Sequence, residues 1–497
     1  MALFEFCFVI LYFVILSILS IYGVHRFIMA TLYRIHRKEK PSPDKTFDDL
    51  PMVTIQLPAF NEKYVIERLI DAVCQIRYPR EKLQIQVLDD STDETQEIAQ
   101  NAVNRKVEEG FQIVYIHRDN REGYKAGALE HGLETATGEF VAVFDADFIP
   151  QPDFLEKTIH YFTDEKVGMV QERWEHINRE FSVLTKTQSV LLDGHFVIEH
   201  TARNRSGRFF NFNGTAGIWR KCTISDAGGW QHDTITEDLD LSYRAQSKGW
   251  KFIYLNDATT PAEIPVEMIA FKTQQHRWAK GSIQVAMKIL PNLLKSRLPL
   301  KVKVEAWMHL TSNISYILMI ILSIMMPLTV RFRVQNSWMT SLWIDMIMFC
   351  CATLSIAMFY LLAQKEARKQ SLPDRLLYLP IVMCLGIGLS VNNCRAVIEA
   401  LTKHKSGFVR TPKYGVLKSG DDWQHVKYGF KMNWQPYVET AFGIYFAIAI
   451  VQTIISGGYA SVPFLCLFCA GYLYVGLGTF LGRSGLFSKR KPVDQTA

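Results

Sequence analysis

The segment Glu139–Asp147, "EFVAVFDAD", decides the fold of the central part of the chain. Its apolar, β-branched run predicts a short buried strand. Two carboxylates, Asp145 and Asp147, follow with one residue between them. Such a pair can share a divalent cation bound to a diphosphate, because Mg²⁺ and Mn²⁺ favour oxygen ligands and keep substrate phosphates in their shell. The alternative is an ordinary turn at the end of a strand, where Asp is common.

The sequence around this segment alternates strands with helices. This alternation predicts an α/β domain with a mostly parallel sheet, whose ligands bind at the C-terminal ends of the strands. Asp89 and Asp90 close a second strand, so they are expected at the same edge of the sheet as Asp145 and Asp147. The other segments with strand periodicity are 52–60, 83–90, 111–118 and 250–257, and those with helical periodicity include 62–76 and 95–110.

A third acidic segment is "TITEDLDLSYR", Thr234–Arg244. One acidic residue would be enough to cap the helix that its apolar residues predict. The segment instead holds Glu237, Asp238 and Asp240 together. A carboxylate beside a metal-bound sugar nucleotide could take a proton from an acceptor hydroxyl, so we consider both roles, cap and general base.

The segment "QQHRW", Gln274–Trp278, places an arginine beside a tryptophan shortly before an apolar stretch. The guanidinium of Arg277 could bind a diphosphate with two parallel hydrogen bonds. Trp278 could offer its flat face to a sugar ring. A tryptophan at this place could equally be a membrane-interface residue.

Composition places these motifs in a membrane protein. The chain has 497 residues, 48% of them hydrophobic, and a mild net charge of +6 without a basic stripe, which argues against nucleic acid as a partner. Five apolar segments are long enough to span a bilayer as helices, and the first lacks the basic start of a signal peptide. The predicted spans are Phe4–Met29, Trp307–Val330, Leu342–Ala363, Tyr437–Ile455 and Val462–Leu481.

These spans divide the chain. The Lys and Arg residues that follow the first span place the large domain in the cytoplasm and the N-terminus outside. Leu376–Leu401 contains Asn392, Arg395 and Glu399, so we interpret it as re-entrant or interfacial, and Ser282–Val304 as an amphipathic interfacial helix. The predicted division is 1–30, first span; 31–280, catalytic domain; 281–304, interfacial helix; 305–363, second and third spans; 364–436, re-entrant segment and a loop; 437–481, last two spans; 482–497, basic cytoplasmic tail.

The ordered set of motifs resembles a known family. "LPAFNE", "LDDSTDET", "GYKAGAL", "DAD", "FNGTAGIWR", "TED" and "QQHRW" occur in the order found in processive family-2 glycosyltransferases, such as cellulose, hyaluronan and chitin synthases. The stretch from "FNFNGTAGIWR" to "QQHRW" most resembles the plant cellulose synthase-like glucomannan synthases. The resemblance covers residues 51–286 by motif and the membrane segments by layout only. It implies a GT-A-type, Rossmann-like catalytic domain inserted between transmembrane helices.

The resemblance also implies roles for single residues. In the family, the matching residues bind the nucleotide, hold the metal–diphosphate unit, act as base and form the acceptor platform at the mouth of a channel. A loop, "GFVRTPKYG" (Gly407–Gly415), resembles the gating loop of cellulose synthases, with Phe408, Thr411 and Lys413 matching and Arg410 in place of a valine. The implied roles are nucleotide contact for Asp90 with Glu62 and Lys125; Mg²⁺ or Mn²⁺ and diphosphate for Asp145 and Asp147; general base for Asp238; diphosphate and acceptor binding for Gln274, Arg277 and Trp278; phosphate contact for Thr411 and Lys413.

The expected activity is therefore an inverting transfer from UDP-glucose or GDP-mannose to a growing β-linked polysaccharide. A β-1,4 glucan or mannan would be secreted through the enzyme's own channel, in the plasma membrane or a Golgi-like membrane. The partners implied are the sugar nucleotide, the glycan and membrane lipids. Two alternatives stay open, a non-processive transferase acting on a lipid such as ceramide, and a non-catalytic scaffold or transporter.

Overall fold

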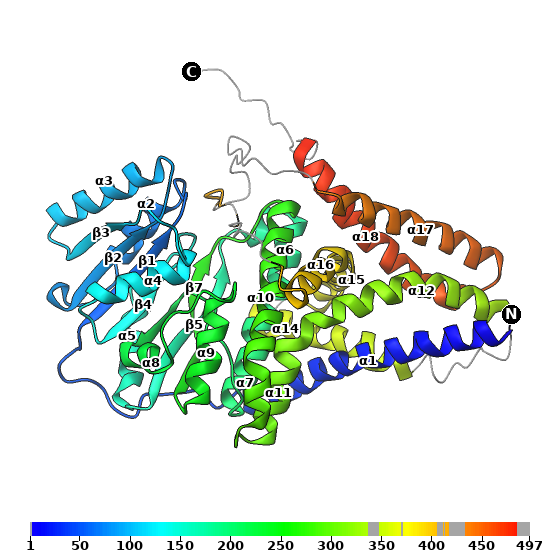
Figure 1. Ribbon diagram of the computed structural model, residues 1–497, viewed down its shortest axis with the longest axis horizontal. Helices are drawn as coiled ribbons and strands as arrows, with labels where there is room; N and C mark the ends of the chain where they lie inside the picture. Colours follow the sequence, from blue (N-terminus) through cyan, green and yellow to red (C-terminus); the bar gives the residue numbers. More distant parts are fainter. Residues whose placement is uncertain are drawn as a thin grey trace.

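One seven-stranded sheet forms the centre of the predicted catalytic domain, with its strands in the order β3-β2-β1-β4-β6-β5-β7 (Figure 1). The computed structural model describes residues 2–335, 347–368, 371–404, 411, 413–416 and 433–484. All neighbouring strands pair in parallel except β6, which is antiparallel to β4 and β5. The predicted α/β fold is confirmed. The strands are β1 (Val53–Ala59), β2 (Leu83–Asp89), β3 (Ile113–His117), β4 (Phe140–Val143), β5 (Val167–His176), β6 (Gly217–Arg220) and β7 (Lys251–Ala262).

The register of the parallel strands brings the acidic motifs to one edge. Val53 at the start of β1 lies opposite Phe140 at the start of β4, and Ala59 at the end of β1 lies opposite Asp89 of β2. The chain after β2 and the chain after β4 therefore leave the sheet on the same side. Asp90 follows the end of β2 directly, and Asp145 follows the end of β4 after one residue, Phe144, so both lie at the edge that the sequence predicts.

Helices cover both faces of the sheet, because successive side chains of a strand point to opposite faces. On β4, Phe140 and Ala142 pack into a core with α2, α3 and α5, whereas Val143 packs into a second core with α4, α8 and α9. The helices of this half are α2 (Ile66–Cys74), α3 (Thr95–Glu108), α4 (Tyr124–Thr135), α5 (Phe154–Thr158), α6 (Val183–Asp193), the π-helix η4 (Gly194–His200), α7 (Thr201–Arg205), α8 (Lys221–Asp226) and α9 (Glu237–Ser247).

Long apolar helices extend away from the sheet on the other side of the molecule (Figure 1). Within the described residues, four helical segments are long and apolar enough to cross a membrane, and a fifth is possible if the bent pair α15–α16, with its 41° bend, is one span. The chain is thus a multi-pass membrane protein by length and composition. The segments are Leu3–His36, Leu300–Gln335, Gln435–Ile455 and Tyr459–Leu481. The elements are α1 (Ala2–His36), α11 (Leu300–Thr311), α12 (Ser315–Gln335), η7 (Phe349–Leu354), α14 (Ser355–Arg368), α15 (Leu372–Gly388), α16 (Ser390–Leu401), α17 (Gln435–Ile455) and α18 (Val462–Ser484).

The structure describes two further predicted membrane segments, one of them only in part. The span predicted at Leu342–Ala363 begins among residues outside the described part, and its described portion lies in η7 and α14. The bend between α15 and α16 falls at Leu389, inside the segment interpreted as re-entrant or interfacial. Its geometry is that of a broken span or a re-entrant loop.

Helix α10 (Met268–Lys295) is continuous across the predicted boundary between residues 280 and 281. It lies along the border between the sheet domain and the membrane helices (Figure 1). Of the apolar residues that predicted an interfacial helix, Ile283 and Leu290 are buried against α16 and α11, while Met287 and Leu294 are exposed. One helix therefore belongs both to the catalytic domain and to its contact with the membrane part.

Candidate active site

The acid pair that follows β4 is held by two lysines from distant parts of the chain. Nζ of Lys125, on the first turn of α4, lies 2.5 Å from Oδ1 of Asp145. Lys413 donates a hydrogen bond to Oδ2 of Asp147, which is nearly buried. Burial disfavours the charged form of Lys125, but the carboxylates of Asp145 and Glu237 outweigh this and raise its pKa. Both carboxylates of the DxD motif thus face positive charge.

Asp90 is fixed by an arginine that the sequence did not single out. The guanidinium of Arg118 donates to Oδ1 and Oδ2 of Asp90 over 2.8 and 2.5 Å. The same guanidinium donates to the carbonyl oxygens of Glu122 and Tyr124 over 3.2 and 3.1 Å. Asp90 and Arg118 therefore hold the loop that leads to Lys125, which places all three residues at one corner of the edge.

A tight turn, Asn213–Gly214–Thr215, joins these residues to the TED segment. Gly214 has a φ of +80°, and a Cβ at this residue would lie 3.1 Å from Oδ2 of Asp238 and 3.2 Å from Nζ of Lys125. The carbonyl oxygen of Gly214 accepts from Lys125 over 2.8 Å, and the hydroxyl of Thr215 accepts from the backbone N–H of Asp145 over 2.9 Å. Only glycine fits here without strain, because the position combines positive φ with close neighbours.

The first turn of α9 carries the candidate base. Thr236 at the N-cap makes no side-chain capping bond. Oδ1 of Asp238 accepts a hydrogen bond from the adjacent backbone N–H of Leu239 over 2.8 Å. Burial, and then the neighbouring carboxylate of Glu237, raise the pKa of Asp238 to about 7. Burial also raises the pKa of Glu237. A carboxylate with a pKa near 7 is suited to general base catalysis at neutral pH.

Arg277 on α10 approaches this acidic group from the membrane side. Its Nη2 donates to the hydroxyl of Thr411 over 2.6 Å. Burial lowers the pKa of Arg277, and the carboxylates of Asp145, Glu237, Asp147 and Glu62 act against this lowering. The electrostatic partners show that the arginine and the acidic motifs share one site.

Helix α10 also supports the TED turn directly. A Cβ at Gly281 would lie 2.4 Å from Cγ2 of Thr236, so helix and turn are in close contact. Oε1 of Gln284 accepts from the backbone N–H of Ile235 over 2.9 Å. One turn further, Nζ of Lys288 lies 2.7 Å from Asp233 and 3.0 Å from Asp240. The position of the acidic pair therefore depends on α10.

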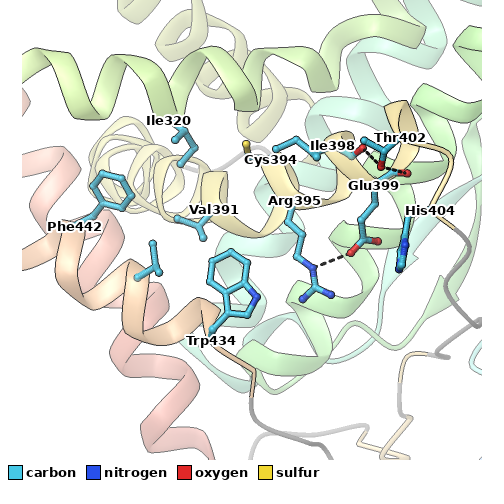
Figure 2. A pocket seen from close by; sticks show the side chains of 11 residues that line it. Ile320, Val391, Cys394, Arg395, Ile398, Glu399, Thr402, His404, Trp434 and Phe442 are labelled. Carbon is cyan, nitrogen blue, oxygen red and sulfur yellow. Dashed lines mark hydrogen bonds and ion pairs between the residues drawn. The ribbon is translucent and has the colours of Figure 1, made fainter.

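The opposite side of the QQHRW turn contacts the membrane helices. Nζ of Lys280 donates to Glu399 of α16 over 3.1 Å, and His276 lies 3.3 Å from the same carboxylate. Arg395, one turn earlier on α16, donates to Glu399 over 2.8 Å, as Figure 2 shows. Gln274 and Trp278 are half-buried on the same helix as Arg277. By helical spacing, residues 274, 277 and 278 share a face.

A pocket of about 470 Å³ opens between α12, α16 and α17. Figure 2 shows its lining, with Ile320, Val391 and Phe442 at one end and Arg395, Glu399 and His404 at the other. Its lining includes neither the carboxylates of the DxD and TED motifs nor Arg277. It is thus separate from the site at the edge of the sheet, although Glu399 contacts α10 from it.

Residues 411 and 413–416 are docked on the catalytic domain by a second buried acid. Glu263, just beyond β7, accepts from the backbone N–H groups of Tyr414 and Gly415 over 2.9 and 3.0 Å. The hydroxyl of Tyr414 donates to Glu267 over 2.7 Å. Burial raises the pKa of Glu263. The docking brings Thr411 to Arg277 and Lys413 to Asp147.

The arrangement fits a divalent cation that shares its shell with a diphosphate. No group of three or more His, Cys, Asp or Glu side chains within the described residues could hold a metal by itself. Mg²⁺ and Mn²⁺ are commonly held by one or two carboxylates together with substrate phosphates. Asp145 and Asp147 supply two carboxylates that already bind cationic groups.

The structure brings together residues from six separate motifs. Asp90, Lys125, Asp145, Asp147, Asp238, Arg277, Thr411 and Lys413 form one connected group, and Glu62 lies close enough to act on the charge of Arg277. Phe408 and Arg410 of the predicted gating loop lie outside the described residues. Sequence reasoning missed Arg118, the turn at Gly214 and Glu263. Only Gly214 had a visible signal, since it belongs to the quoted "FNGT".

A family model described as "Glycosyltransferase like family 2" matches residues 51–281, which contain the sheet and most of the site. This domain belongs to glycosyltransferase family 2. The chain is 40% identical over 280 residues to glucomannan 4-β-mannosyltransferase 1 of Oryza sativa subsp. japonica, an alignment that covers 55% of the chain and 53% of that protein. It is 42% identical over 251 residues to glucomannan 4-β-mannosyltransferase 7 of Arabidopsis thaliana, covering 50% of the chain and 45% of that protein. The chain thus spans about half the length of these curated relatives.

Among solved structures, the chain resembles a mannosyltransferase from Pyrobaculum calidifontis in complex with GDP-Man and Mn²⁺. The TM-score is 0.53 at 20% identity, over 79% of this chain and all of that one. This likeness shows the fold of the family-2 domain. The prediction of a family-2 glycosyltransferase domain similar to the glucomannan synthases is confirmed.

Proposed function

We propose that the protein is a membrane-embedded inverting glycosyltransferase that elongates a β-1,4-linked mannan or glucomannan. GDP-mannose is the preferred donor in this proposal and UDP-glucose the second. The observation that carries it is the meeting of the DxD pair, Asp238 and Arg277 at one edge of the sheet. The names of the two plant relatives support mannose and the β-1,4 linkage.

In the proposed reaction, the acceptor hydroxyl attacks the anomeric carbon of the donor from the side opposite the diphosphate. Asp238 removes the proton from that hydroxyl as the new bond forms, and its pKa of about 7 matches this task. Arg277 and Lys125 stabilise the negative charge of the departing diphosphate. A divalent cation held by Asp145 and Asp147 would neutralise further charge on the same group.

The membrane part gives the proposal its cellular setting. The apolar helices support a membrane location for the site. We place the catalytic domain in the cytoplasm and the N-terminus outside because of the Lys and Arg residues that follow the first span. Trp278, which shares a helical face with Arg277, is proposed as the platform for the terminal sugar of the acceptor. The product would then enter the membrane next to the site at which it is made.

A donor screen with product analysis tests the proposed function. The full chain, purified in detergent with Mn²⁺, is given GDP-mannose, UDP-glucose or UDP-N-acetylglucosamine, and release of each nucleoside diphosphate is followed. We expect release from GDP-mannose, and a product that β-1,4-mannanase degrades. A lipid-extractable, mannanase-resistant product would point to a lipid acceptor. Asp238→Asn, which keeps the donor site, serves as the control for background hydrolysis.

A further inference from the structure

A chain of partly buried hydrogen bonds and ion pairs connects the membrane helix α1 with the turn Asn213–Thr215. It begins at Arg26 of α1, which pairs with the carboxylate of Glu199. Glu199 also contacts Arg203 over 3.3 Å, and its Oε2 lies 3.1 Å from Nδ1 of His195. Nε2 of His195 lies 3.2 Å from the side-chain amide nitrogen of Asn213. Glu199, Arg26 and Arg203 have no role in the proposed transfer reaction, although ion pairs fix the positions of all three.

The direction of each hydrogen bond in this chain follows from one backbone group. The N–H of Asn213 can only donate, so the atom of Gln171 that faces it, at 3.1 Å, is the oxygen. The amide nitrogen of Gln171 then donates to Oδ1 of Asn213 over 3.0 Å, which fixes the orientation of the Asn213 amide. The nitrogen of that amide must therefore donate to Nε2 of His195.

This order determines the protonation of two histidines. Because Nε2 of His195 accepts, its ring proton is on Nδ1 and is donated to Glu199. His200 donates from Nε2 to Oδ1 of Asn213 over 2.6 Å. Burial lowers the pKa of His200 to about 3 and the pKa of His195 well below its usual value, so both rings are neutral. Neutral rings can take one arrangement only in this chain of bonds.

The residue at the end of the chain begins the turn on which the site depends. Gly214, next to Asn213, accepts from Lys125 and leaves no space for a side chain beside Asp238. Thr215 accepts from the backbone of Asp145. A rotation of the Asn213 amide would therefore displace the groups that contact the base and the DxD pair.

We propose that His195 is a positioning residue, which holds the amide of Asn213 and through it the Asn213–Thr215 turn, and which couples this turn to the docking of α1 by way of Glu199 and Arg26. The inference rests on the proposed role of Asp238 as base. His195 and Glu199 lie one turn apart in the π-helix η4, a rare form that often marks functional sites. Glu305 of α11 secures the same cluster, since it accepts from Arg203 over 2.8 Å and from His25 over 3.0 Å.

Two polar substitutions of His195 distinguish a role in positioning the amide of Asn213 from a role in packing alone. His195→Asn keeps a group near Nδ1 that can bond to Glu199 but is too short to reach Asn213. His195→Gln places an amide oxygen near Nε2, where it can accept from Asn213. We expect kcat for transfer to fall about 10–100-fold in His195→Asn, with KM for the donor within about 3-fold, because a misplacement of about 1 Å costs about 10²-fold. His195→Gln should recover at least about 5-fold of this loss.

A double-mutant cycle and a matched control complete the test. If His195 acts through Asn213, then His195→Asn in an Asn213→Ala background should reduce kcat by less than about 3-fold further. His176→Leu removes another buried histidine, which lies 3.4 Å from Asp193 and does not contact the turn, and it should leave kcat per folded molecule unchanged.

Equal kcat values for His195→Asn and His195→Gln, or fully multiplicative effects in the cycle, would overturn the inference while the parent protein still transfers sugar. Failure of the parent to release nucleoside diphosphate from any donor would instead remove the proposed function on which the inference rests.

Discussion

Gly281 of α10 lies directly against Thr236, the residue that precedes the acidic pair Glu237–Asp238. A Cβ on Gly281 would be 2.4 Å from Cγ2 and 2.6 Å from Oγ1 of Thr236. The contact joins the helix that carries Arg277 to the turn that carries the candidate base. The distance between these two groups is therefore set by a residue that has no side chain.

The first prediction concerns this contact. Gly281→Ala should move the TED turn away from α10 and lower kcat for transfer by about 10²-fold, since reacting groups are sensitive to shifts of about 1 Å. Gly386→Ala is the matched control, because Gly386 also lies within a helix and a Cβ there would meet nothing within 4 Å. Steady-state transfer rates per folded molecule give the comparison. Similar rates in the two variants would show that the helix–turn contact is not needed for the reaction.

The second prediction is that substitution of Asp238 has opposite effects on the transfer rate and on the stability of the fold. Asp238→Asn removes the base and should lower transfer by about 10²–10⁴-fold, while binding of the nucleoside diphosphate with Mn²⁺ is retained. The pKa of Asp238 is raised to about 7 in the folded protein, whereas it is about 3.9 in the unfolded chain. The folded protein therefore binds this proton more tightly, and the resulting gain in the free energy of unfolding is complete below about pH 3.9. That stabilisation is lost as the pH rises through about 7.

Asp238→Asn should therefore melt at a higher temperature than the parent at pH 8, by about 2 °C or more, with a smaller difference at pH 5. The transfer rate of the parent should rise with pH through the same range, because the base acts as the carboxylate. Thermal unfolding followed at both pH values, with transfer measured on the same samples, checks this. A variant that is both inactive and less stable at pH 8 would contradict it.

The third prediction concerns the docking of residues 411 and 413–416. Glu263→Gln replaces one of two carboxylate oxygens by an NH₂ group that faces a backbone N–H, so the segment should dock less well. We expect KM for the sugar nucleotide to rise about 10-fold, because Thr411 and Lys413 lose their positions. Glu267→Gln is the control: its amide oxygen can still accept from the hydroxyl of Tyr414, and KM should change by less than about 2-fold. A KM in Glu263→Gln equal to that of the control would count against a role for docking in donor binding.

The fourth prediction tests the acceptor platform. Trp278→Ala should abolish polymer formation but leave most of the hydrolysis of donor by water, which needs no platform. Polymer yield and nucleoside diphosphate release are measured on one detergent-purified sample. If both decrease in step with the amount of folded protein, Trp278 is a structural residue at the membrane interface and not a platform.

The strand ends and their carboxylates could be predicted because the signal is local. An apolar run followed by Asp145 or by Asp89 predicts a strand, and the acidic residue marks the edge of the sheet at which the strand ends. Strand β6 could not be found in this way, since its four residues, Gly217–Arg220, have no alternation and pair antiparallel between β4 and β5.

The contacts that complete the site come from distant parts of the chain. Lys413 and Asp147 are 266 residues apart, and Arg118 and Asp90 are 28 apart. No pattern in the sequence indicates that residues so far apart are in contact. The helix predicted over Ser282–Val304 was visible from the spacing of its apolar residues, but α10 ends at Lys295 and a separate helix, α11, begins at Leu300. The burial of α10 against α11 and α16 could not be predicted, because it depends on contacts between helices that are distant in the sequence.

Within one turn of α10, His276 and Lys280 contact Glu399 of α16 while Arg277 reaches Thr411 on the other side. If the bent pair α15–α16 is one span, its tilt would follow the thickness of the hydrocarbon layer, as that of any helix with a hydrophobic mismatch does. Such a tilt would be transmitted through Glu399 to α10 and would move the guanidinium of Arg277, which is proposed to bind the donor. The turnover of this protein is thus expected to depend on the acyl-chain length of the lipids. The optimum should lie at the bilayer thickness at which Arg277 and Asp238 are at the distance that the transfer reaction requires.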